Sequence, residues 1–184
     1  MTRVGELGAG AGKFTRSLLQ TGAQILSMEP VEGMRKKFRS VNSHVDIISG
    51  TAEQIPAQDQ SFEIINAAQA AHWFDPDQEP IEIHRVLKTV GRLILIWNVR
   101  DETQAVFAEL TRLMDPYEGS TPRYKSMNWK KGFERSGLFS PFEVAEFSYV
   151  QKSTVEIAVD RVGSVSFISA LPKDERKKSF GPRA

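Results

Sequence analysis

The chain has 184 residues, with 24 lysines and arginines against 23 aspartates and glutamates, so its formal net charge is +1. This near-neutral balance gives no support for a nucleic-acid or membrane-surface binder, and a hydrophobic content of 40% is enough to build a buried core. The absence of cysteine excludes a disulfide framework, a thiolate zinc site and a cysteine nucleophile.

Three further features bear on the class of protein. The histidines show no metal-ligand spacing, so no metal is expected. No apolar run approaches the roughly 20 residues that span a membrane. The start of the chain, Met1 to Gly5, lacks the apolar segment of a signal peptide, and the expected location is therefore cytoplasmic.

Strands and helices are expected to alternate through the first hundred residues. A short strand starts at Val4, and further apolar runs of strand length occupy 25–28, 45–50, 62–68 and 91–98. Amphipathic stretches predict helices from the first glycine-rich turn to Gly22, at 32–40 and at 80–87. This alternation predicts an α/β domain with a doubly wound, mostly parallel sheet that is covered on both faces.

The pattern changes after residue 100. The expected elements are a helix at 103–114, a short helix from Trp129 to Leu138, an alternating edge strand at 142–150 and helical segments within 154–171. We predict a single domain over 1–184, with a cofactor-binding half at 1–100, a partial substrate-side half at 101–171 and a basic tail at 172–184.

The turn after the first strand has the spacing Glu6-x-Gly8-x-Gly10-x-Gly12. Glycine permits a tight turn and a close approach of ligand to the main chain, and the helix that follows directs free N–H groups at that ligand. A dinucleotide fingerprint requires Gly-x-Gly-x-x-Gly/Ala. Its last position falls on Lys13 in one frame and on neither glycine nor alanine in the other, which disfavours an NAD(P)-dependent oxidoreductase. A glycine-rich turn without a ligand is the remaining alternative.

Glu29 stands at the carboxyl end of the predicted strand 25–28. A carboxylate at this position, next to the glycine turn, can accept hydrogen bonds from both hydroxyls of a ribose. The alternative is a surface acid beside Pro30 at the entry to a helix.

Four segments in this order carry a resemblance to a known family. Beside Glu6–Gly12 and Glu29, residues 50–56 read Gly-Thr-Ala-Glu-Gln-Ile-Pro, and residues 85–92 read Arg-Val-Leu-Lys-Thr-Val-Gly-Arg. The chain resembles the class I S-adenosylmethionine-dependent methyltransferases, specifically the type 11 small-molecule group. The resemblance is close over residues 4–100 and implies a Rossmann-like methyltransferase fold with S-adenosyl-L-methionine as the cofactor.

The resemblance also implies the parts of the cofactor that each segment contacts. The glycine turn would wrap the methionine part, Glu29 would bind the ribose, and residues 50–56 would pack beside the adenine. Thr51 stands where the family often has aspartate, and a hydroxyl is a weaker, neutral acceptor for the adenine amino group. The implied cofactor-binding residues are Glu6, Gly8, Ala9, Gly10, Gly12, Glu29, Pro30, Thr51, Ala52, Glu53, Ala68 and Gln69.

Ligands of doubly wound sheets lie beyond the carboxyl ends of the strands. Three segments are expected beyond these ends, at 67–75, at 97–101 and in the loop 115–129. Two stretches within them, His72-Trp73-Phe74-Asp75 and Trp97-Asn98-Val99-Arg100-Asp101, resemble a subset that includes trans-aconitate-type carboxyl methyltransferases. The resemblance implies a small-molecule methyl acceptor, with a carboxylate as one candidate. A carboxylate acceptor needs no general base, whereas an alcohol or phenol does.

Five residues of these segments are candidates for the acceptor side of the site. His72 is the candidate base, or alternatively an orienting histidine, and Asn98 lies closest to the cofactor methyl by position. Trp73 and Trp97 would wall the acceptor or face the sulfonium, or else be core aromatics. Arg100 would hold an anionic acceptor, or else be a solvated loop residue.

The family places one or two helices before the first strand and an antiparallel strand between the fifth and sixth strands. Here three residues precede Val4, and no strand is predicted after 142–150. We therefore expect a methyltransferase that lacks the N-terminal lid helices and the last antiparallel strand. The alternative is a truncated, non-catalytic module that binds the cofactor or a partner.

Overall fold

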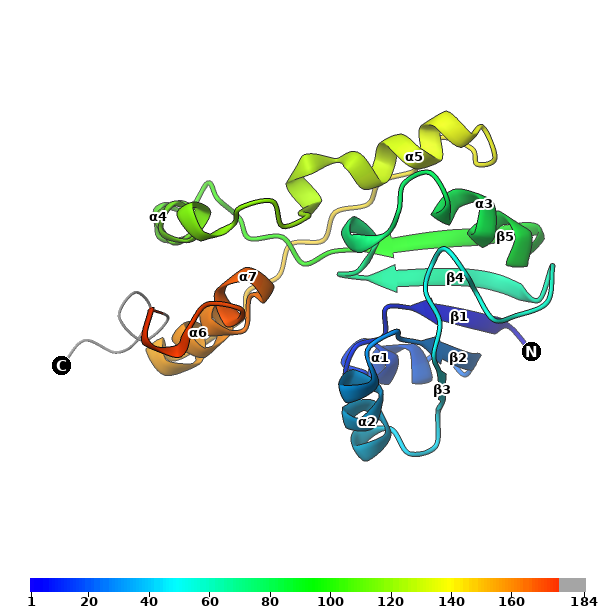
Figure 1. Cartoon of the computed structure of the whole chain (residues 1–184), viewed down its shortest axis with the longest axis horizontal. Helices are drawn as coiled ribbons and strands as arrows, with labels where there is room; N and C mark the ends of the chain where they lie inside the picture. The colour runs from blue at the N-terminus through cyan, green and yellow to red at the C-terminus, as the bar shows by residue number, and fades with distance from the viewer. Residues whose placement is uncertain (176–184) are drawn as a thin grey trace. The chain divides into compact units, whose positions relative to one another are not determined.

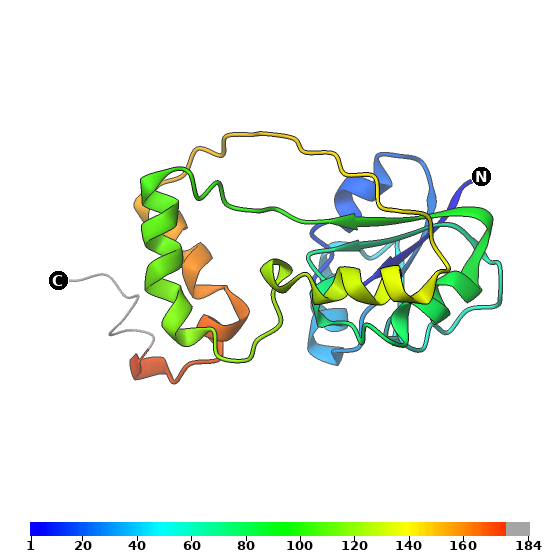
Figure 2. The same cartoon turned by 90° about the horizontal axis from the view of Figure 1, so that it is seen from above.

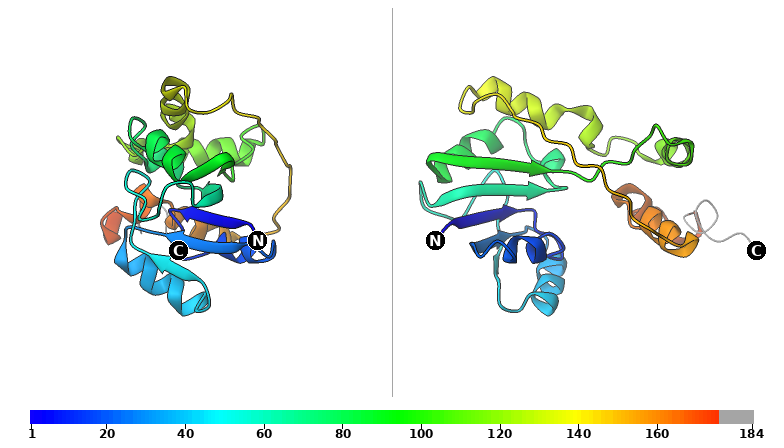
Figure 3. Two further views of the ribbon diagram at one scale, coloured as in Figure 1. Left: turned by 90° about the vertical axis from the view of Figure 1, so that its right-hand side faces the viewer. Right: turned by 180° about the vertical axis from the view of Figure 1, so that it is seen from behind.

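A parallel sheet organises the N-terminal part of the computed structural model, which describes residues 1–175 (Figure 1). Its strand order is β3-β2-β1-β4-β5, and each neighbouring pair is parallel. The strands are β1 (Arg3–Leu7), β2 (Gln24–Met28), β3 (Asp46–Ile48), β4 (Phe62–Ala68) and β5 (Leu87–Ile96). Figure 3 shows β5, β4, β1 and β2 side by side in this order.

Helices cover both faces of the sheet. The helices around it are α1 (Thr15–Leu19), α2 (Glu32–Val41), η1 (Ala71–Trp73), α3 (Glu79–Val86), η3 (Tyr124–Ser126) and α5 (Asn128–Ser136). On one face, Ile25 and Ile47 pack with Phe38 of α2, and Leu18 of α1 lies against this cluster.

Successive residues of a strand point to opposite faces, so Met28 and Ile65 belong to the other face. There they pack with Ile83 of α3 and Phe133 of α5. The prediction of a doubly wound α/β fold is confirmed.

The junction between α3 and β5 differs from the predicted one. The predicted helix at 80–87 ends at Val86, and the strand predicted to start at Gly91 starts at Leu87. Between Leu87 and Arg92 the chain is folded rather than extended, since a Cβ on Gly91 would lie 2.9 Å from the carbonyl oxygen of Lys88. The register shifts between Phe62 and Ile64, which accommodates the extra residues of β5.

The strand predicted at 142–150 is wrong. This segment has no regular structure, and Phe147 and Val150 are 87% and 93% exposed. Alternation of apolar and polar residues specifies which face of a strand would be buried, but a strand also requires a partner for its main-chain groups. Within residues 1–175, no strand pairs with this segment.

The chain divides into two compact units. The first comprises residues 1–98 and 122–142, and the second comprises residues 99–121 together with the chain from Glu143 onward. The second unit contains α4 (Ala105–Met114), η2 (Asp115–Tyr117), α6 (Val155–Gly163) and α7 (Ser166–Ser169), so helices form where they were predicted (Figure 2). Its core is built by Met114, Val162, Phe167 and Ile168.

Most of the predicted basic tail at 172–184 lies outside the described residues, which end at 175. In the described part, none of the helices combines the length and the apolar character needed to cross a membrane.

Candidate functional site

The glycine turn connects β1 to α1 and adopts a left-handed backbone at three positions. Gly8, Gly10 and Gly12 have φ angles of 65°, 56° and 78°. Main-chain bonds hold the turn, since the N–H of Ala9 donates to the Met28 carbonyl and that of Gly12 donates to the Ala9 carbonyl. Only glycine adopts such φ values without strain, which explains the Gly-x-Gly-x-Gly spacing.

The surroundings of the three glycines differ. A Cβ atom on Gly8 would lie 2.5 Å from the Cβ of Ala70, and one on Gly12 would lie 2.0 Å from the Nδ2 of Asn42. A Cβ on Gly10 would meet nothing within 4 Å. Gly8 and Gly12 are therefore required by packing, whereas Gly10 leaves its main chain open to a ligand. This open position fits the expected approach of the cofactor.

Glu29 follows β2 directly and faces the glycine turn. It is only 7% exposed, and its Oε2 accepts the Gly10 N–H at 3.0 Å while its Oε1 accepts the Val31 N–H at 2.9 Å. Each carboxylate oxygen has a second lone pair, so both can still accept a hydroxyl proton. The carboxylate therefore fits a ribose diol beside Gly10.

Glu6 lies within the sheet rather than at its open edge. Its buried Oε2 accepts hydrogen bonds from the hydroxyls of Thr15 and Ser27, each at 2.7 Å. Burial raises the pKa of the Glu6 carboxyl, and the bonds from Ser27 and Thr15 oppose that rise. These contacts connect α1 to β2, and a contact with the cofactor stays a prediction.

Asn66 is a buried polar residue that the sequence analysis missed. It lies opposite Glu6 in the β1–β4 pairing, and Ser27 lies on the other side of Glu6. Neither polar atom of its side chain has a hydrogen-bond partner in the described structure. The sequence signal that could have identified it is a single asparagine within the otherwise apolar end of the run 62–68.

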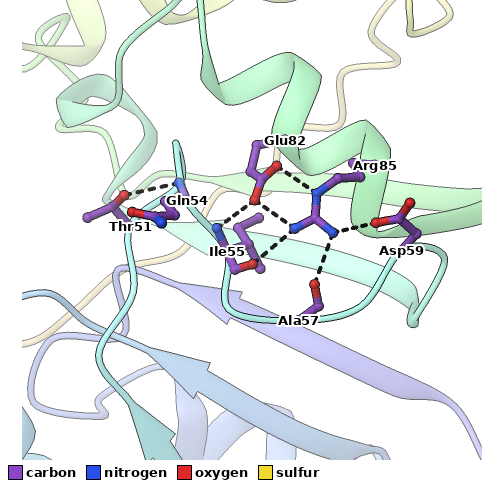
Figure 4. Close-up of polar contacts among 7 residues, drawn as sticks. All are labelled: Thr51, Gln54, Ile55, Ala57, Asp59, Glu82 and Arg85. Atoms are coloured by element: carbon purple, nitrogen blue, oxygen red, sulfur yellow. Dashed lines mark hydrogen bonds and ion pairs between the residues drawn. The ribbon is translucent and has the colours of Figure 1, made fainter.

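The loop after β3, where the adenine is expected to pack, is fixed by side chains of α3 (Figure 4). Arg85 donates to the carbonyls of Ile55 and Ala57, each at 3.0 Å. The Glu82 carboxylate accepts the Ile55 N–H at 2.8 Å. Arg85 also forms ion pairs with Glu82 at 2.7 Å and with Asp59 at 2.6 Å.

The hydroxyl of Thr51 accepts the Gln54 N–H at 3.2 Å and so shapes the start of this loop (Figure 4). Ala52 is buried, while Pro30 and Thr51 are exposed. A cleft of about 510 Å³ lies between the loop and α3. Its lining residues are Ser49, Gly50, Thr51, Gln54, Ile55, Pro56, Glu82 and Arg85.

Three carboxyl groups lie where this loop meets the segment before α3. The Oε1 of Glu53 accepts the Asp75 N–H at 2.8 Å. Glu79, at the start of α3, is fully buried, and neither of its carboxyl oxygens has a partner in the described residues. Burial, followed by the charges of Glu53 and Asp75, raises the pKa of Glu79 to about 9, so this side chain is a neutral acid at pH 7.

The carboxyl ends of β4 and β5 are joined by Gln69. Its backbone has a φ of 58°, which is unusual for a residue with a side chain. Its N–H donates to the Ile96 carbonyl at 2.8 Å, and its side-chain amide donates to the Asn98 carbonyl at 3.2 Å. Such strained positions concentrate at functional sites. Ala68, beside it, is half-buried.

His72 and Trp97 meet beyond these strand ends. The indole N–H of Trp97 donates to the Nδ1 of His72 at 3.3 Å. Burial lowers the pKa of the His72 imidazole, and the positive charge of Arg123 lowers it further. Trp73, at 51% exposed, has its ring centroid 5.5 Å from that of His72.

Trp97 belongs to an aromatic cluster, which we define as Trp97, Tyr124 and Trp129. The Trp97 ring centroid lies 5.0 Å from that of Tyr124 and 4.4 Å from that of Trp129. The indole N–H of Trp129 donates to the Tyr124 carbonyl at 3.2 Å. The loop 115–129 was expected at this end of the sheet, but the sequence analysis did not single out Tyr124, Trp129 or Arg123 within it.

The first unit contains all the candidate site residues except Arg100, which belongs to the second unit. Its elements bring Gly10 beside Glu29, Glu53 beside Asp75, and His72 beside Trp97. Direct contacts of these residues with a cofactor or an acceptor stay predictions.

The chain is similar in sequence to proteins described as methyltransferases. The protein family described as "Methyltransferase domain" matches residues 5–95. An uncharacterised methyltransferase-like protein of Schizosaccharomyces pombe is 35% identical over 178 residues, which cover 94% of this chain and 68% of that protein. An uncharacterised methyltransferase of Mycobacterium tuberculosis is 33% identical over 181 residues, which cover 97% of this chain and 70% of that protein.

A solved structure agrees with these sequence relatives. The crystal structure of YcgJ from Bacillus subtilis matches with a TM-score of 0.62 and 26% identity, over 97% of this chain and 81% of that chain. The chain therefore belongs to the class I S-adenosylmethionine-dependent methyltransferases, and S-adenosylmethionine is the cofactor of this family. This membership argues against the nicotinamide-dependent alternative.

Proposed function

We propose that this chain transfers the methyl group of S-adenosylmethionine to a carboxylate oxygen of a small molecule. The observation that carries the proposal is the open main chain of Gly10 beside the buried carboxylate of Glu29. When bound, S-adenosylmethionine supplies a methyl group on a positively charged sulfur, which is an activated donor.

The residues of the chain would then bind and orient the two reactants. The glycine turn would bind the methionine part, Glu29 would accept the ribose hydroxyls, and the loop held by Arg85 would support the adenine. Holding two reactants in line can supply a large share of the rate enhancement by itself.

The acceptor would lie at the carboxyl ends of β4 and β5, where His72, Trp97 and Asn98 are found. A carboxylate is already deprotonated at neutral pH and has a lone pair ready for the methyl group, so it needs no general base. The described structure supports this acceptor class, because the pKa of His72 is lowered and its Nδ1 already accepts the indole N–H of Trp97.

Cofactor binding is tested by isothermal titration of the full chain with S-adenosylhomocysteine, S-adenosylmethionine and NADH. We expect the first two to bind and NADH not to bind. Binding of none of them would overturn the proposed function, and preferential binding of NADH would replace it with redox chemistry.

Gly10→Ala tests the proposed place of binding. The added methyl group would project into the space open to the ligand, so we expect the affinity for S-adenosylhomocysteine to fall about tenfold or more, or about 1.4 kcal/mol. The matched control is Gly22→Ala, because Gly22 also has a positive φ, 71°, and nothing within 4 Å of an added Cβ. Both variants should lose a similar stability of about 1 kcal/mol. Equal affinity in the two variants would refute the site.

Methyl transfer itself is tested with isotopically labelled S-adenosylmethionine and a panel of small carboxylic acids, phenols and amines. The proposal expects base-labile methyl esters from the acids. A chain that binds S-adenosylhomocysteine but methylates none of them would support the alternative, a cofactor-binding module without catalysis.

A further inference from the structure

We infer that His72 acts as a fixed hydrogen-bond donor to an anionic methyl acceptor, and that Arg123 supplies the positive charge which selects that anion. This inference rests on the proposed function, because it concerns the acceptor side of the same site. It assigns His72 a role opposite to that of a general base, and it adds Arg123 as a specificity-determining residue.

The first step concerns which nitrogen of His72 carries the proton. The indole N–H of Trp97 can only donate, and it is directed at Nδ1 of His72 over 3.3 Å. Nδ1 must therefore be unprotonated and act as an acceptor. In the neutral imidazole the single proton is then on Nε2, so Nε2 presents an N–H to any ligand.

A general base would require the opposite arrangement. Its Nε2 would have to be free of the proton, which places the proton on Nδ1 in the neutral ring. The Nδ1 proton would then face the indole proton of Trp97, and both donors would lose their partner in a half-buried site. The contact with Trp97 therefore favours the donor form of His72 over the base form.

The second step concerns how firmly Trp97 is held. Its ring packs against Tyr124 and Trp129, and Trp129 is in turn fixed by its bond to the Tyr124 carbonyl. Aromatic pairs at such separations favour defined relative orientations. Trp97 is thus a positioning residue, which acts on the ligand through His72.

The third step concerns charge. Arg123 immediately precedes Tyr124 of the aromatic cluster and is half-buried. The ring of its neighbour Tyr124 lies 5.0 Å from that of Trp97, the donor to His72, and the positive charge of Arg123 lowers the pKa of the imidazole. The site thus combines a positive charge with a neutral N–H donor. A guanidinium offers several N–H donors in a planar fork that matches a carboxylate. An anionic acceptor would be attracted by the charge and would accept a hydrogen bond from His72, whereas a cationic amine would be repelled.

The tautomer of His72 is measured directly by ¹⁵N nuclear magnetic resonance of the full chain, with His72→Phe used for assignment. We expect a neutral ring at pH 7 with a protonated Nε2 and an unprotonated Nδ1. Trp97→Phe removes the donor to Nδ1 and should allow both tautomers to appear. A protonated Nδ1 in the unmodified chain would overturn the inference.

Selection of an anion is measured by titration of the chain saturated with S-adenosylhomocysteine. The probes are trans-aconitate, succinate and benzoate, each compared with its neutral amide. We expect at least one acid to bind about tenfold or more tightly than its amide. Arg123→Gln should remove this preference, and Arg123→Lys should restore part of it. The inference fails if no acid is preferred, or if Arg123→Gln leaves the preference unchanged.

The donor role of His72 is separated from a purely structural role by two substitutions. Glutamine places an N–H donor near the position of Nε2 but has no useful basicity, so His72→Gln should retain much of the affinity for the acid. His72→Phe should lose that affinity with unchanged binding of S-adenosylhomocysteine. Equal losses in both variants would contradict the donor role, whereas loss of S-adenosylhomocysteine binding in the unmodified chain would instead contradict the proposed function.

Discussion

At the scale of single residues, Glu79 is the least expected group in the first unit. A carboxyl group that is fully buried without a hydrogen-bond partner is stable only as the neutral acid. The folded chain therefore keeps this proton up to a pH of about 9, whereas the unfolded chain releases it near its ordinary value of 4.5. Between these two values the folded state binds one proton more than the unfolded state.

This proton makes stability depend on pH. Because the folded state binds more protons, the free energy of unfolding should fall as the pH rises from about 4.5 to about 9, by at most about 1.4 kcal/mol per pH unit. Glu79→Gln should remove this contribution, so the variant should be the more stable protein at pH 8.5 and should lose that advantage near pH 5. The measurement is urea unfolding followed by tryptophan fluorescence, which reports on the first unit because Trp73, Trp97 and Trp129 all lie there.

The control for this prediction is Glu32→Gln. Glu32 is an exposed residue of α2 that pairs with Lys36, and exposed pairs contribute little to stability. Its substitution should leave the pH dependence in place. An unchanged slope in Glu79→Gln would show that Glu79 ionises in the folded chain.

The tight turn after β1 could be predicted from the sequence, because a left-handed backbone at three positions requires the observed spacing of glycines. The partners of Glu6 and the partnerless amide of Asn66 could not be predicted in this way. They depend on which strands are neighbours, and β1 pairs with β4, which is more than 50 residues away in the sequence. The loop 115–129 was expected beyond the strand ends, but that Tyr124 is the residue of this loop that packs on Trp97 depends on the tertiary fold.

At the scale of elements, the loop after β3 shows how a helix can hold a binding segment in place. Arg85 donates to two carbonyls of the loop and pairs with two carboxylates (Figure 4). Glu82 accepts the N–H of Ile55 in the same loop. The shape of the loop therefore depends on a helix that follows it by about 30 residues in the sequence.

Arg85→Ala should loosen this loop. Loss of the bonds to Ile55 and Ala57 leaves buried or half-buried carbonyls without a donor, so we expect a decrease in stability of about 1–3 kcal/mol. Hydrogen exchange of residues 51–57 should become faster, and the affinity for S-adenosylhomocysteine should fall. Arg92→Ala is the control, because Arg92 is an exposed arginine of β5. Unchanged exchange in Arg85→Ala would contradict a supporting role for α3.

The predictions of secondary structure were correct where a local sequence pattern was sufficient to specify the element. The apolar run at 62–68 became β4 with the same bounds, and the amphipathic stretch at 32–40 became α2. The failures came from non-local causes. The segment 142–150 has the pattern of a strand without a pairing partner, and β5 starts early because Leu87 already pairs with Phe62 ahead of a register shift.

At the scale of the whole molecule, the division into two units separates the cofactor side from a small helical cluster. The residues implied for cofactor binding, from Glu6 to Gln69, belong to the first unit. The chain also spans about 70% of the length of the relatives from yeast and mycobacteria.

Limited proteolysis with chymotrypsin should first cut the exposed segment 143–150. Phe147 and Tyr149 are exposed there without regular structure, whereas Phe38 and Phe62 are fully buried. Mass spectrometry of the first fragments identifies the cleaved bond. The double variant Phe147→Ser, Tyr149→Ser should delay this first cut, and early cleavage at Phe38 or Phe62 would contradict the described fold.

The bond between Glu29 and the Gly10 N–H has a consequence for the thermodynamics of binding. It holds the left-handed turn in place in the free protein, so the conformational entropy of the turn is lost during folding and not during association. The cofactor would thus meet a preorganised surface, and its binding would carry only a small penalty for ordering the loop. The Glu29 carboxylate would therefore have two roles: it restrains the turn in the free protein, and it would accept hydrogen bonds from the bound cofactor.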